Sequence, residues 1–283
     1  MGIYLNPGNE DFRRVVNSDI YIDKSLLIKY TNSVFNTEQQ YICVSRPRRF
    51  GKSMAVNMLT AYYSRGCDSE ELFSNLKISG SPDFEKHLNK YNVIHLNMQG
   101  FLSKTKNTEQ MIALIVRAVC RDIFREYPDI DYLDKSILSC VLDDVFQEYK
   151  IPFVIIIDEW DCIFRTHKND LDSQKEYLNF LRDLIKDKSY LTLAYMTGIL
   201  PIMKYGEHSA INVFYEYSMT DAKPIEEFTG FTEDEVRGLC EKYNMPFEET
   251  KRWYDGYYVD GVSIYNPKSV VEAMLRGKFS NYW

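Results

Sequence analysis

Long apolar runs, paired cysteines and an excess of positive charge are all missing from this sequence of 283 residues. No stretch approaches the roughly 20 apolar residues that a helix needs to cross a bilayer, and the amino terminus has no basic segment followed by an apolar one. The six cysteines form no C-x-x-C pair and do not cluster with the four histidines, which argues against a zinc site or a disulfide framework. We therefore expect a cytoplasmic protein without a targeting or membrane segment.

The balance of charge excludes a further class of partner. Lysine and arginine total 34 against 41 aspartates and glutamates, a formal net charge of −7, so affinity of the whole surface for nucleic acid or anionic membrane is not expected. An apolar fraction of 45% with 14% aromatic residues is enough to fill a core. Repeats and low-complexity linkers are absent, and the length suits one core with a smaller appendage.

The most informative segment is residues 45–53, which read S-R-P-R-R-F-G-K-S between a β-type run at 41–44 and a helix-type run at 54–63. A Gly-Lys-Ser at a strand-to-helix turn places backbone N–H groups at the positive end of a helix, where they bind phosphate. Lys52 then reaches the outer phosphates, and the Ser53 hydroxyl ligates magnesium. The segment predicts a nucleotide-phosphate site made of Arg46, Pro47, Arg48, Arg49, Phe50, Gly51, Lys52, Ser53 and Met54.

This segment departs from the usual P-loop pattern at two positions. Arg46 stands where a first glycine is expected, and Pro47 removes one backbone N–H from the loop. Because successive N–H groups orient the phosphates, a loop that holds nucleotide without turning it over remains an alternative. An isolated Gly-Lys-Ser can also be an ordinary helix start, so the interpretation depends on a second motif.

The second motif is the apolar run at residues 153–157, which is followed by Asp158 and Glu159. A continuous apolar run of this kind is typical of a strand buried on both faces. At the end of such a strand an aspartate can hold magnesium, directly or through water, and a glutamate can polarise the attacking water. We therefore predict metal binding by Ser53 and Asp158 and water activation by Glu159. The alternative is a solvated strand end.

Thr197 is the third candidate catalytic residue, beside Lys52 and Glu159. It follows a predicted strand at residues 190–196, and a small polar residue at such a strand end can sense the terminal phosphate. It could instead cap the following turn. Asp161, three residues past Asp158, could support the surroundings of the metal or be a surface aspartate.

Apolar spacing predicts the remaining core elements, a strand at residues 92–98 and helices at 108–126, 137–149 and 174–187. We predict a core at residues 1–220 and a small, mostly helical, lid-like region at 221–283.

The predicted C-terminal region carries two helix-start signals and an aromatic cluster. Thr232-Glu-Asp-Glu opens a helix in the manner of a capping box, and Pro267 suits the first turn of a final helix. The aromatic cluster is either the core of this region or a surface for a partner or a nucleobase; it comprises Trp253, Tyr254, Tyr257 and Tyr258.

Eight motifs spread over nearly the whole chain resemble those of the AAA-ATPase-like family of bacterial proteins, which often carry a PD-(D/E)XK-type nuclease domain after the ATPase. The resemblance implies an α/β P-loop NTPase fold of the ASCE/AAA-like type, with a mainly parallel sheet flanked by helices. It also implies ATP and Mg²⁺ as ligands and Arg46 as a family variant. The motifs are Tyr21-Ile-Asp-Lys-Ser, Arg46-Pro-Arg-Arg-Phe-Gly-Lys-Ser, Ile157-Asp-Glu-Trp-Asp, Thr197-Gly-Ile-Leu-Pro-Ile, Ser209-Ala-Ile-Asn-Val-Phe, Gly230-Phe-Thr-Glu-Asp-Glu-Val, Trp253-Tyr-Asp-Gly-Tyr and Tyr265-Asn-Pro-Lys-Ser-Val.

The resemblance also bears on nuclease chemistry, since the chain ends about where the family's nuclease portion usually begins. Such a nuclease needs an aspartate and an E-x-K-like element around a metal. Glu148-Tyr-Lys150 has the letters but reads as the polar end of a helix. We expect no nuclease activity from this chain, which would be a truncated or stand-alone ATPase module.

The leading hypothesis is magnesium-dependent ATP hydrolysis, coupled to a change in the C-terminal region that reaches a protein partner, a fused effector or a second copy. Arg48 and Arg49 could neutralise charge in the transition state, contact the phosphates of a neighbouring subunit or of nucleic acid, or be solvated loop charges. The alternatives are a nucleotide-gated assembly module with little turnover and a DNA-associated ATPase accessory to a nuclease. The sequence leaves the choice between ATP and GTP open.

Overall fold

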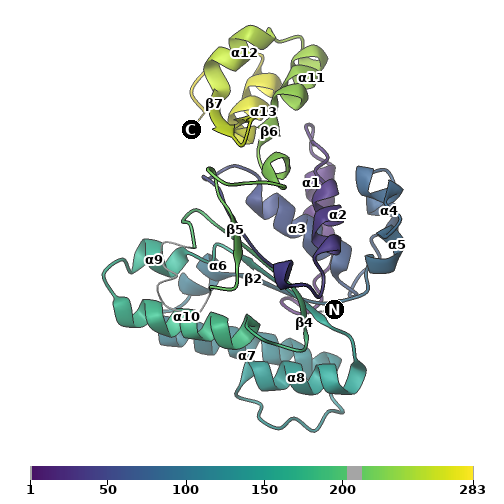
Figure 1. Ribbon diagram of the computed structural model, residues 1–283, viewed down its shortest axis with the longest axis vertical. Helices are drawn as coiled ribbons and strands as arrows, with labels where there is room; N and C mark the ends of the chain where they lie inside the picture. The colour runs from purple at the N-terminus through teal and green to yellow at the C-terminus, as the bar shows by residue number, and fades with distance from the viewer. Residues whose placement is uncertain (1, 203–211, 283) are drawn as a thin grey trace.

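The computed structural model describes residues 2–202 and 212–282, which form two parts stacked along the long axis of the molecule (Figure 1). The larger part contains the amino-terminal elements, and the smaller part, at the top of the view, is built from the last sixty or so residues. We call residues 221–282 the C-terminal unit. The motif that begins at Ser209 lies partly outside the described residues.

A parallel five-stranded sheet forms the centre of the larger part, in the order β2-β3-β4-β1-β5. Its strands β1, β3 and β4 are buried along their whole length, as expected for continuous apolar runs. The carboxyl ends of these strands meet at one edge, where Asp158 lies opposite Thr197 and Ser45 opposite Gly198. The strands are β1 (Tyr41–Ser45), β2 (Asn92–Asn97), β3 (Phe153–Asp158), β4 (Leu191–Gly198) and β5 (Tyr215–Tyr217).

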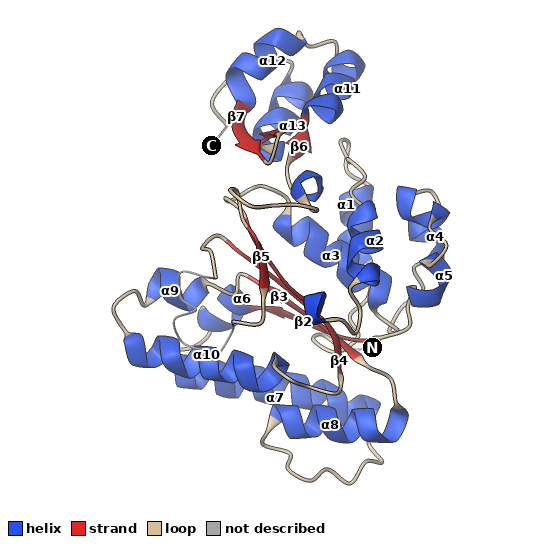
Figure 2. Cartoon of the chain, in the orientation of Figure 1, coloured by secondary structure: helices blue, strands red, loops and turns tan. Residues whose placement is uncertain are grey.

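Helices cover both faces of this sheet (Figure 2), and each face has its own apolar core. The predicted α/β fold with a mainly parallel sheet is therefore confirmed. One face packs against α1 (Glu10–Val16), α2 (Leu26–Ser33), α3 (Lys52–Tyr63), α4 (Glu70–Phe73) and α5 (Phe84–His87). The other packs against α6 (Met98–Leu102), α7 (Thr108–Glu126), α8 (Leu138–Tyr149), α9 (Cys162–Thr166) and α10 (Leu171–Ile185). Short 3-10 turns occur at Glu38–Gln40, Lys77–Gly80 and Glu226–Phe228.

The C-terminal unit combines three helices with a three-stranded antiparallel sheet, in the order β6-β8-β7. The predicted capping box is present, with Thr232 and Glu235 each accepting from the backbone N–H of the other. Pro267 lies in the first turn of the last helix, as predicted. The hairpin of β7 and β8 was not foreseen. The elements are β6 (Phe231–Thr232), α11 (Glu233–Tyr243), α12 (Phe247–Tyr254), β7 (Asp255–Val259), β8 (Val262–Tyr265) and α13 (Pro267–Arg276).

The aromatic cluster of this unit divides into buried and exposed members. Tyr254 belongs to the apolar core beneath α11 and α13, and Tyr257 packs against the core of the hairpin. Trp253 and Tyr258 are 50% and 75% exposed. The core interpretation thus holds for Tyr254 and Tyr257, and a partner or nucleobase surface at Trp253 and Tyr258 stays a prediction.

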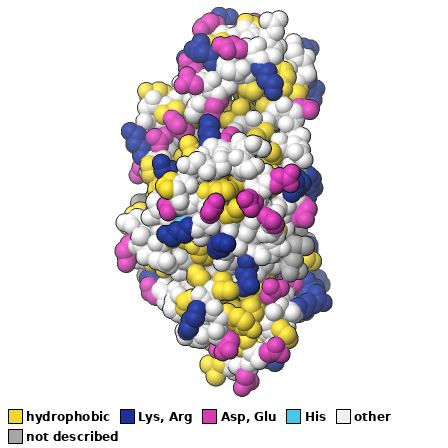
Figure 3. All heavy atoms as spheres, turned by 90° about the vertical axis from the view of Figure 1, so that its right-hand side faces the viewer, with side chains coloured by type: hydrophobic (Ala, Val, Ile, Leu, Met, Phe, Trp, Pro, Cys, Tyr) yellow, Lys and Arg dark blue, Asp and Glu magenta, His cyan; other side chains and the backbone are white. Residues whose placement is uncertain are grey.

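Among the described residues, no helix is both long enough and apolar enough to span a membrane. On the face drawn in Figure 3, acidic and basic side chains are interspersed among apolar ones. All six cysteines have free thiols.

Candidate functional site

The loop between β1 and α3, residues 46–51, is shaped as a phosphate-binding turn, and we call it the phosphate loop. Gly51 precedes the helix with φ +84, a left-handed conformation that favours glycine. No side chain caps the amino terminus of α3, so the N–H groups of its first turn need partners from outside the helix. A helix end of this kind is suited to an anion.

Lys52 closes the phosphate loop on itself in this structure. Its ammonium donates hydrogen bonds of 2.8 Å to the backbone carbonyls of Arg46 and Pro47. Burial lowers the pKa of Lys52, while nearby carboxylates, Asp158 first among them, oppose that shift. These contacts hold the ammonium against the backbone of the loop.

Asp158 receives three hydrogen bonds from residues that the sequence singled out. The Ser53 hydroxyl donates to its Oδ2 at 2.6 Å, and the Thr197 hydroxyl and the Glu159 backbone N–H both donate to its Oδ1. The carboxylate is almost fully buried, so these bonds fix its position. Thr197 therefore uses its hydroxyl to hold Asp158 and does not reach the cleft described below.

Magnesium suits the oxygen donors at this point. Ser53 Oγ and Asp158 Oδ2 are hard oxygen ligands on neighbouring elements, and Mg²⁺ is commonly held by one or two protein oxygens together with substrate phosphates. Within the described ranges, no group of three His, Cys, Asp or Glu side chains is arranged to hold a metal. A magnesium ion here would therefore depend on the phosphates of a nucleotide for the rest of its ligands.

Glu159 is held by an arginine that the sequence did not reveal. Its backbone is left-handed, with φ 55, and its Oε2 accepts a hydrogen bond of 2.9 Å from Arg165 Nη2. Arg165 also lies 3.3 Å from Asp161 through Nε. Asp161 is fully buried, and its Oδ2 accepts the backbone N–H groups of Ile199 and Leu200 at 3.0 and 2.9 Å. Asp161 thus anchors the chain that leaves β4, a placement that neither expected role described.

A cleft of about 500 Å³ brings most of these residues together between the phosphate loop, the ends of β3 and β4, and the C-terminal unit. It is lined by residues that the sequence predicted: Arg48, Arg49, Gly51, Lys52, Ser53, Met54, Asp158 and Glu159. Other lining residues come from the amino-terminal segment, which the sequence predicts to pack beside the site, and from the C-terminal unit: Ser18, Ile20, Ile22, Phe231, Pro267, Lys268 and Val271. Lys268 adds a fourth cation, from α13.

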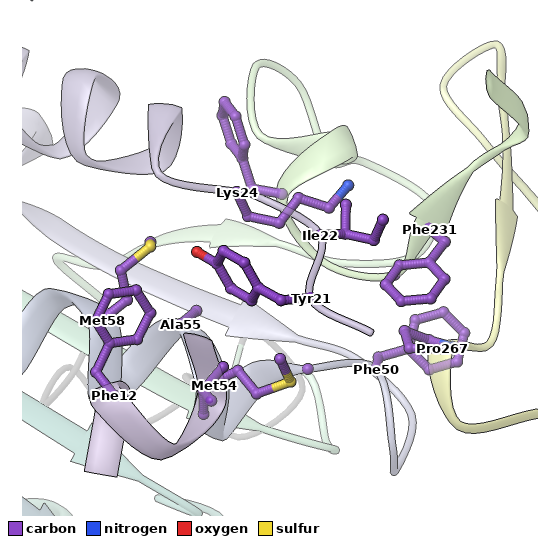
Figure 4. Close-up of a pocket in the computed structure, with 14 residues that line it drawn as sticks. Phe12, Tyr21, Ile22, Lys24, Phe50, Met54, Ala55, Met58, Phe231 and Pro267 are labelled. Atoms are coloured by element: carbon purple, nitrogen blue, oxygen red, sulfur yellow. The ribbon is translucent and has the colours of Figure 1, made fainter. Parts of the chain in front are cut away.

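A smaller apolar pocket adjoins this cleft and shares Ile22, Gly51, Met54, Phe231 and Pro267 with it. Figure 4 shows aromatic and aliphatic side chains from the amino-terminal segment, α3 and the C-terminal unit surrounding it. Its volume is only about 40 Å³, so in this structure it is too small for a nucleobase.

Three of the predicted loop residues lie elsewhere. Arg46 and Phe50 are buried, and neither these two nor Pro47 line the cleft within the described residues. Arg46 and Pro47 face the site through their carbonyls, which accept from Lys52. Arg49 adopts φ 69 and donates to the Tyr282 carbonyl at 3.0 Å.

Two solved structures with a partly similar chain path are distant in sequence. The Aeropyrum pernix ORC1 protein in complex with DNA is 11% identical, with 87% of this chain and 54% of that chain covered and a TM-score of 0.43. Domain III of the Thermotoga maritima replication initiation protein DnaA is 12% identical, with 97% and 94% covered and a TM-score of 0.38.

Two sequence comparisons give a clearer result. The "uncharacterized protein in vnfD 5′region" of Azotobacter chroococcum is 23% identical over 291 residues, and the match covers 99% of this chain but 53% of that relative. The chain thus spans about half the length of this curated relative. The AAA-ATPase-like family, described as "Predicted AAA-ATPase", matches residues 7–206. This chain therefore belongs to the AAA-ATPase-like family.

Proposed function

We propose that this chain binds ATP with Mg²⁺ in the cleft and hydrolyses it. We also propose that a nucleotide in the cleft changes how the C-terminal unit packs against the core. The observation that carries the proposal is the hydrogen bond between Ser53 and Asp158, with Lys52 beside it. It joins the start of a phosphate-binding helix to the end of a buried strand, the arrangement that nucleotide hydrolysis requires.

Binding would use the polar and apolar parts of the site together. Backbone N–H groups of the phosphate loop and the first turn of α3 would hold the phosphates, with Lys52 turning from the loop carbonyls to the outer ones. The apolar walls of the cleft, with Ile22 and Phe231 among them, would flank the base. Ser53 and Asp158 would hold magnesium, which supplies neutralisation of phosphate charge when bound.

Hydrolysis would depend on placing a water and on stabilising charge. Glu159 lines the cleft and is the candidate that polarises the attacking water. Arg48, Arg49 and Lys268 direct positive charge into the same cleft, where it stabilises the developing charge on the phosphoryl oxygens. Thr197, which is bonded to Asp158, would sense changes at the metal position through that carboxylate.

Coupling would arise because both parts of the chain form the cleft. Phe231, Pro267, Lys268 and Val271 line it from the C-terminal unit, so a nucleotide would touch both parts at once. The effector that responds would be a protein partner, a second copy or a further domain in a longer protein.

A nucleotide-gated module with little turnover is the second candidate, favoured by the ion pair between Glu159 and Arg165 at 2.9 Å. The guanidinium occupies Oε2 of Glu159, so that oxygen is not available to a water. In this form the protein would bind ATP readily and hydrolyse it only when a partner releases Glu159.

Calorimetric titration with ATP tests the proposal, with and without magnesium. Wild type should bind, and Lys52→Ala should abolish binding because the loop loses its cation. Lys106→Ala, which removes an exposed lysine that does not line the cleft, is the matched control and should bind as wild type does. Equal affinity in Lys52→Ala and wild type would reject the assigned site.

A further inference from the structure

Two side chains of the phosphate loop turn away from the cleft and enter the seam between the core and the C-terminal unit. Arg46 is 1% exposed and Phe50 is 0% exposed. Residues of a phosphate loop usually serve the ligand, so the burial of these two at a boundary needs its own explanation.

Arg46 joins the end of β1 to two other segments through its guanidinium. Nη1 donates to the Tyr217 carbonyl at the end of β5 at 2.7 Å and to the Ser45 carbonyl at 3.0 Å. Nε donates to the Thr229 hydroxyl of the C-terminal unit at 2.9 Å. Because a buried cation is costly without such partners, these three bonds fix the side chain and the backbone that carries it.

Burial also affects the protonation of this guanidinium. It lowers the pKa of Arg46 to about 10, with Tyr195, Asp260 and Glu226 opposing the shift. The side chain therefore still carries its charge at neutral pH. Two of the opposing carboxylates, Asp260 and Glu226, belong to the C-terminal unit, so charge as well as hydrogen bonding ties Arg46 to that unit.

Phe50 joins the loop to the β7–β8 hairpin. Its ring meets that of Tyr257 edge to face, with centroids 5.0 Å apart, and shares an apolar cluster with Val259 and Ile264. In Figure 4 the ring extends from the loop toward Pro267 of the C-terminal unit.

The backbone reinforces this contact. The Phe50 carbonyl accepts the Gly230 N–H at 2.9 Å. Gly230 has φ +87, and a Cβ there would lie 2.3 Å from Ile264 Cγ2 within the C-terminal unit and 3.3 Å from Phe50 Cδ1 of the loop, so the close approach of Phe50 leaves no room for a side chain at this position.

We propose that Arg46 and Phe50 are positioning residues, through which the C-terminal unit sets the conformation of the phosphate loop. This proposal rests on the proposed function, because the loop conformation matters through the phosphates that it binds. It also gives a reason for the arginine that replaces the first glycine of the P-loop pattern. At this position the arginine side chain fixes the loop to the C-terminal unit, whereas a glycine would leave the backbone of the loop free.

The coupling between the phosphate loop and the C-terminal unit must act in both directions. If contact with the C-terminal unit favours the loop conformation that binds phosphate, bound nucleotide must strengthen that contact by the same factor. Coupling between sites is typically worth about 5- to 150-fold in affinity. A substitution that weakens the contact between the core and the C-terminal unit should therefore weaken ATP binding, although it removes no contact with the ligand.

The test compares two neighbouring tyrosines of β7. Tyr257→Ala removes the ring that packs against Phe50, whereas Tyr258→Ala removes a ring that is 75% exposed. Amide hydrogen exchange of residues 46–54 is measured in the nucleotide-free proteins, and ATP affinity is measured on the same samples. We expect faster loop exchange and about tenfold weaker ATP binding in Tyr257→Ala, and wild-type values in Tyr258→Ala.

Thr229→Val is a second variant that keeps the shape of the side chain and removes the oxygen that accepts from Arg46 Nε. It should shift both readouts in the same direction, and it replaces Tyr257→Ala if that variant unfolds the C-terminal unit. The proposal would be overturned if both folded variants showed loop exchange as slow as that of wild type. It would also be overturned if wild type bound ATP and both variants bound it with the same affinity. Faster loop exchange in a chain whose wild type fails to bind ATP would instead uphold the positioning role and overturn the proposed function.

Discussion

Ser53 and Asp158, which are 105 residues apart in the chain, are joined by a hydrogen bond of 2.6 Å. The bond connects the first turn of α3 to the last residue of β3. Two motifs that are separate in the sequence therefore form one site, and the oxygens of both residues are available to the same cation. The predictions below follow from this junction and from the residues packed around it.

Asp158→Asn should weaken binding of magnesium with ATP about 10- to 100-fold, as typical changes around a metal ligand do. The amide oxygen can still accept from the Thr197 hydroxyl and the Glu159 N–H, but the NH2 group cannot accept from Ser53, and the amide lacks the charge that holds a divalent ion. Titration with ATP in EDTA is the internal control and should give wild-type affinity. The assignment of the metal position fails if magnesium strengthens ATP binding equally in the variant and in wild type.

Asp161→Ala should reduce the free energy of unfolding by about 3–5 kcal/mol, because it leaves two backbone N–H groups without their acceptor and removes the buried carboxylate that faces Arg165 at 3.3 Å. Urea unfolding measures the change. Asp172→Ala, at an exposed position of α10, is the control and should stay within about 0.5 kcal/mol of wild type. A similar small loss for Asp161→Ala would show that Asp161 does not anchor the exit of β4.

Arg165→Gln should raise the turnover of bound ATP about fivefold. The pair with Glu159 is partly exposed, so it is worth about 1 kcal/mol at most, and its loss frees the carboxylate to act on water. Single-turnover phosphate release separates this effect from binding. Arg182→Gln, which breaks an exposed pair with Asp183 on α10, should leave the rate unchanged. Slower turnover in Arg165→Gln would mean that the arginine orients Glu159 for catalysis and does not restrain it.

His95 should make the protein less stable in acid. Burial lowers the pKa of this partly buried imidazole, although Asp158 and Asp11 oppose the shift. The unfolded chain, in which histidine titrates near about 6.5, then binds more protons than the folded one, so stability is lost as the pH falls through that value. Unfolding free energies measured from pH 7.5 to pH 5 should fall less steeply in His95→Gln. Parallel curves for the two proteins would contradict this account.

The elements that the sequence predicted are those that depend on local patterns. Residues 108–126 form α7 with the predicted limits, and the run that ends in Asp158 forms β3. Helical spacing and continuous apolar runs reflect burial against a sheet, so they can be recognised in a single sequence. Helices α4, α5, α6 and α9 have four or five residues each, too few to show a period, and they exist through their packing.

The parts of the site that could not be predicted are contacts across long distances in the sequence. Nothing near Arg46 indicates that its guanidinium meets Thr229, 183 residues away, and a loop arginine beside a lysine is more simply assigned to phosphate. Lys268 reaches the cleft only because the C-terminal unit lies over it. Arg165 had a faint signal, since it lies four residues after Asp161 on the same helical turn.

Magnesium-dependent phosphate release from ATP and GTP, with nucleotide binding measured on the same samples, tests the central claim most directly in wild type, Lys52→Ala and Glu159→Gln. The account predicts turnover in wild type alone, and binding in wild type and Glu159→Gln but not in Lys52→Ala. Turnover by Glu159→Gln at the wild-type rate would contradict the assignment of the water activator. Nucleotide binding by wild type without any turnover would contradict hydrolysis by this chain and leave the nucleotide-gated module in its place.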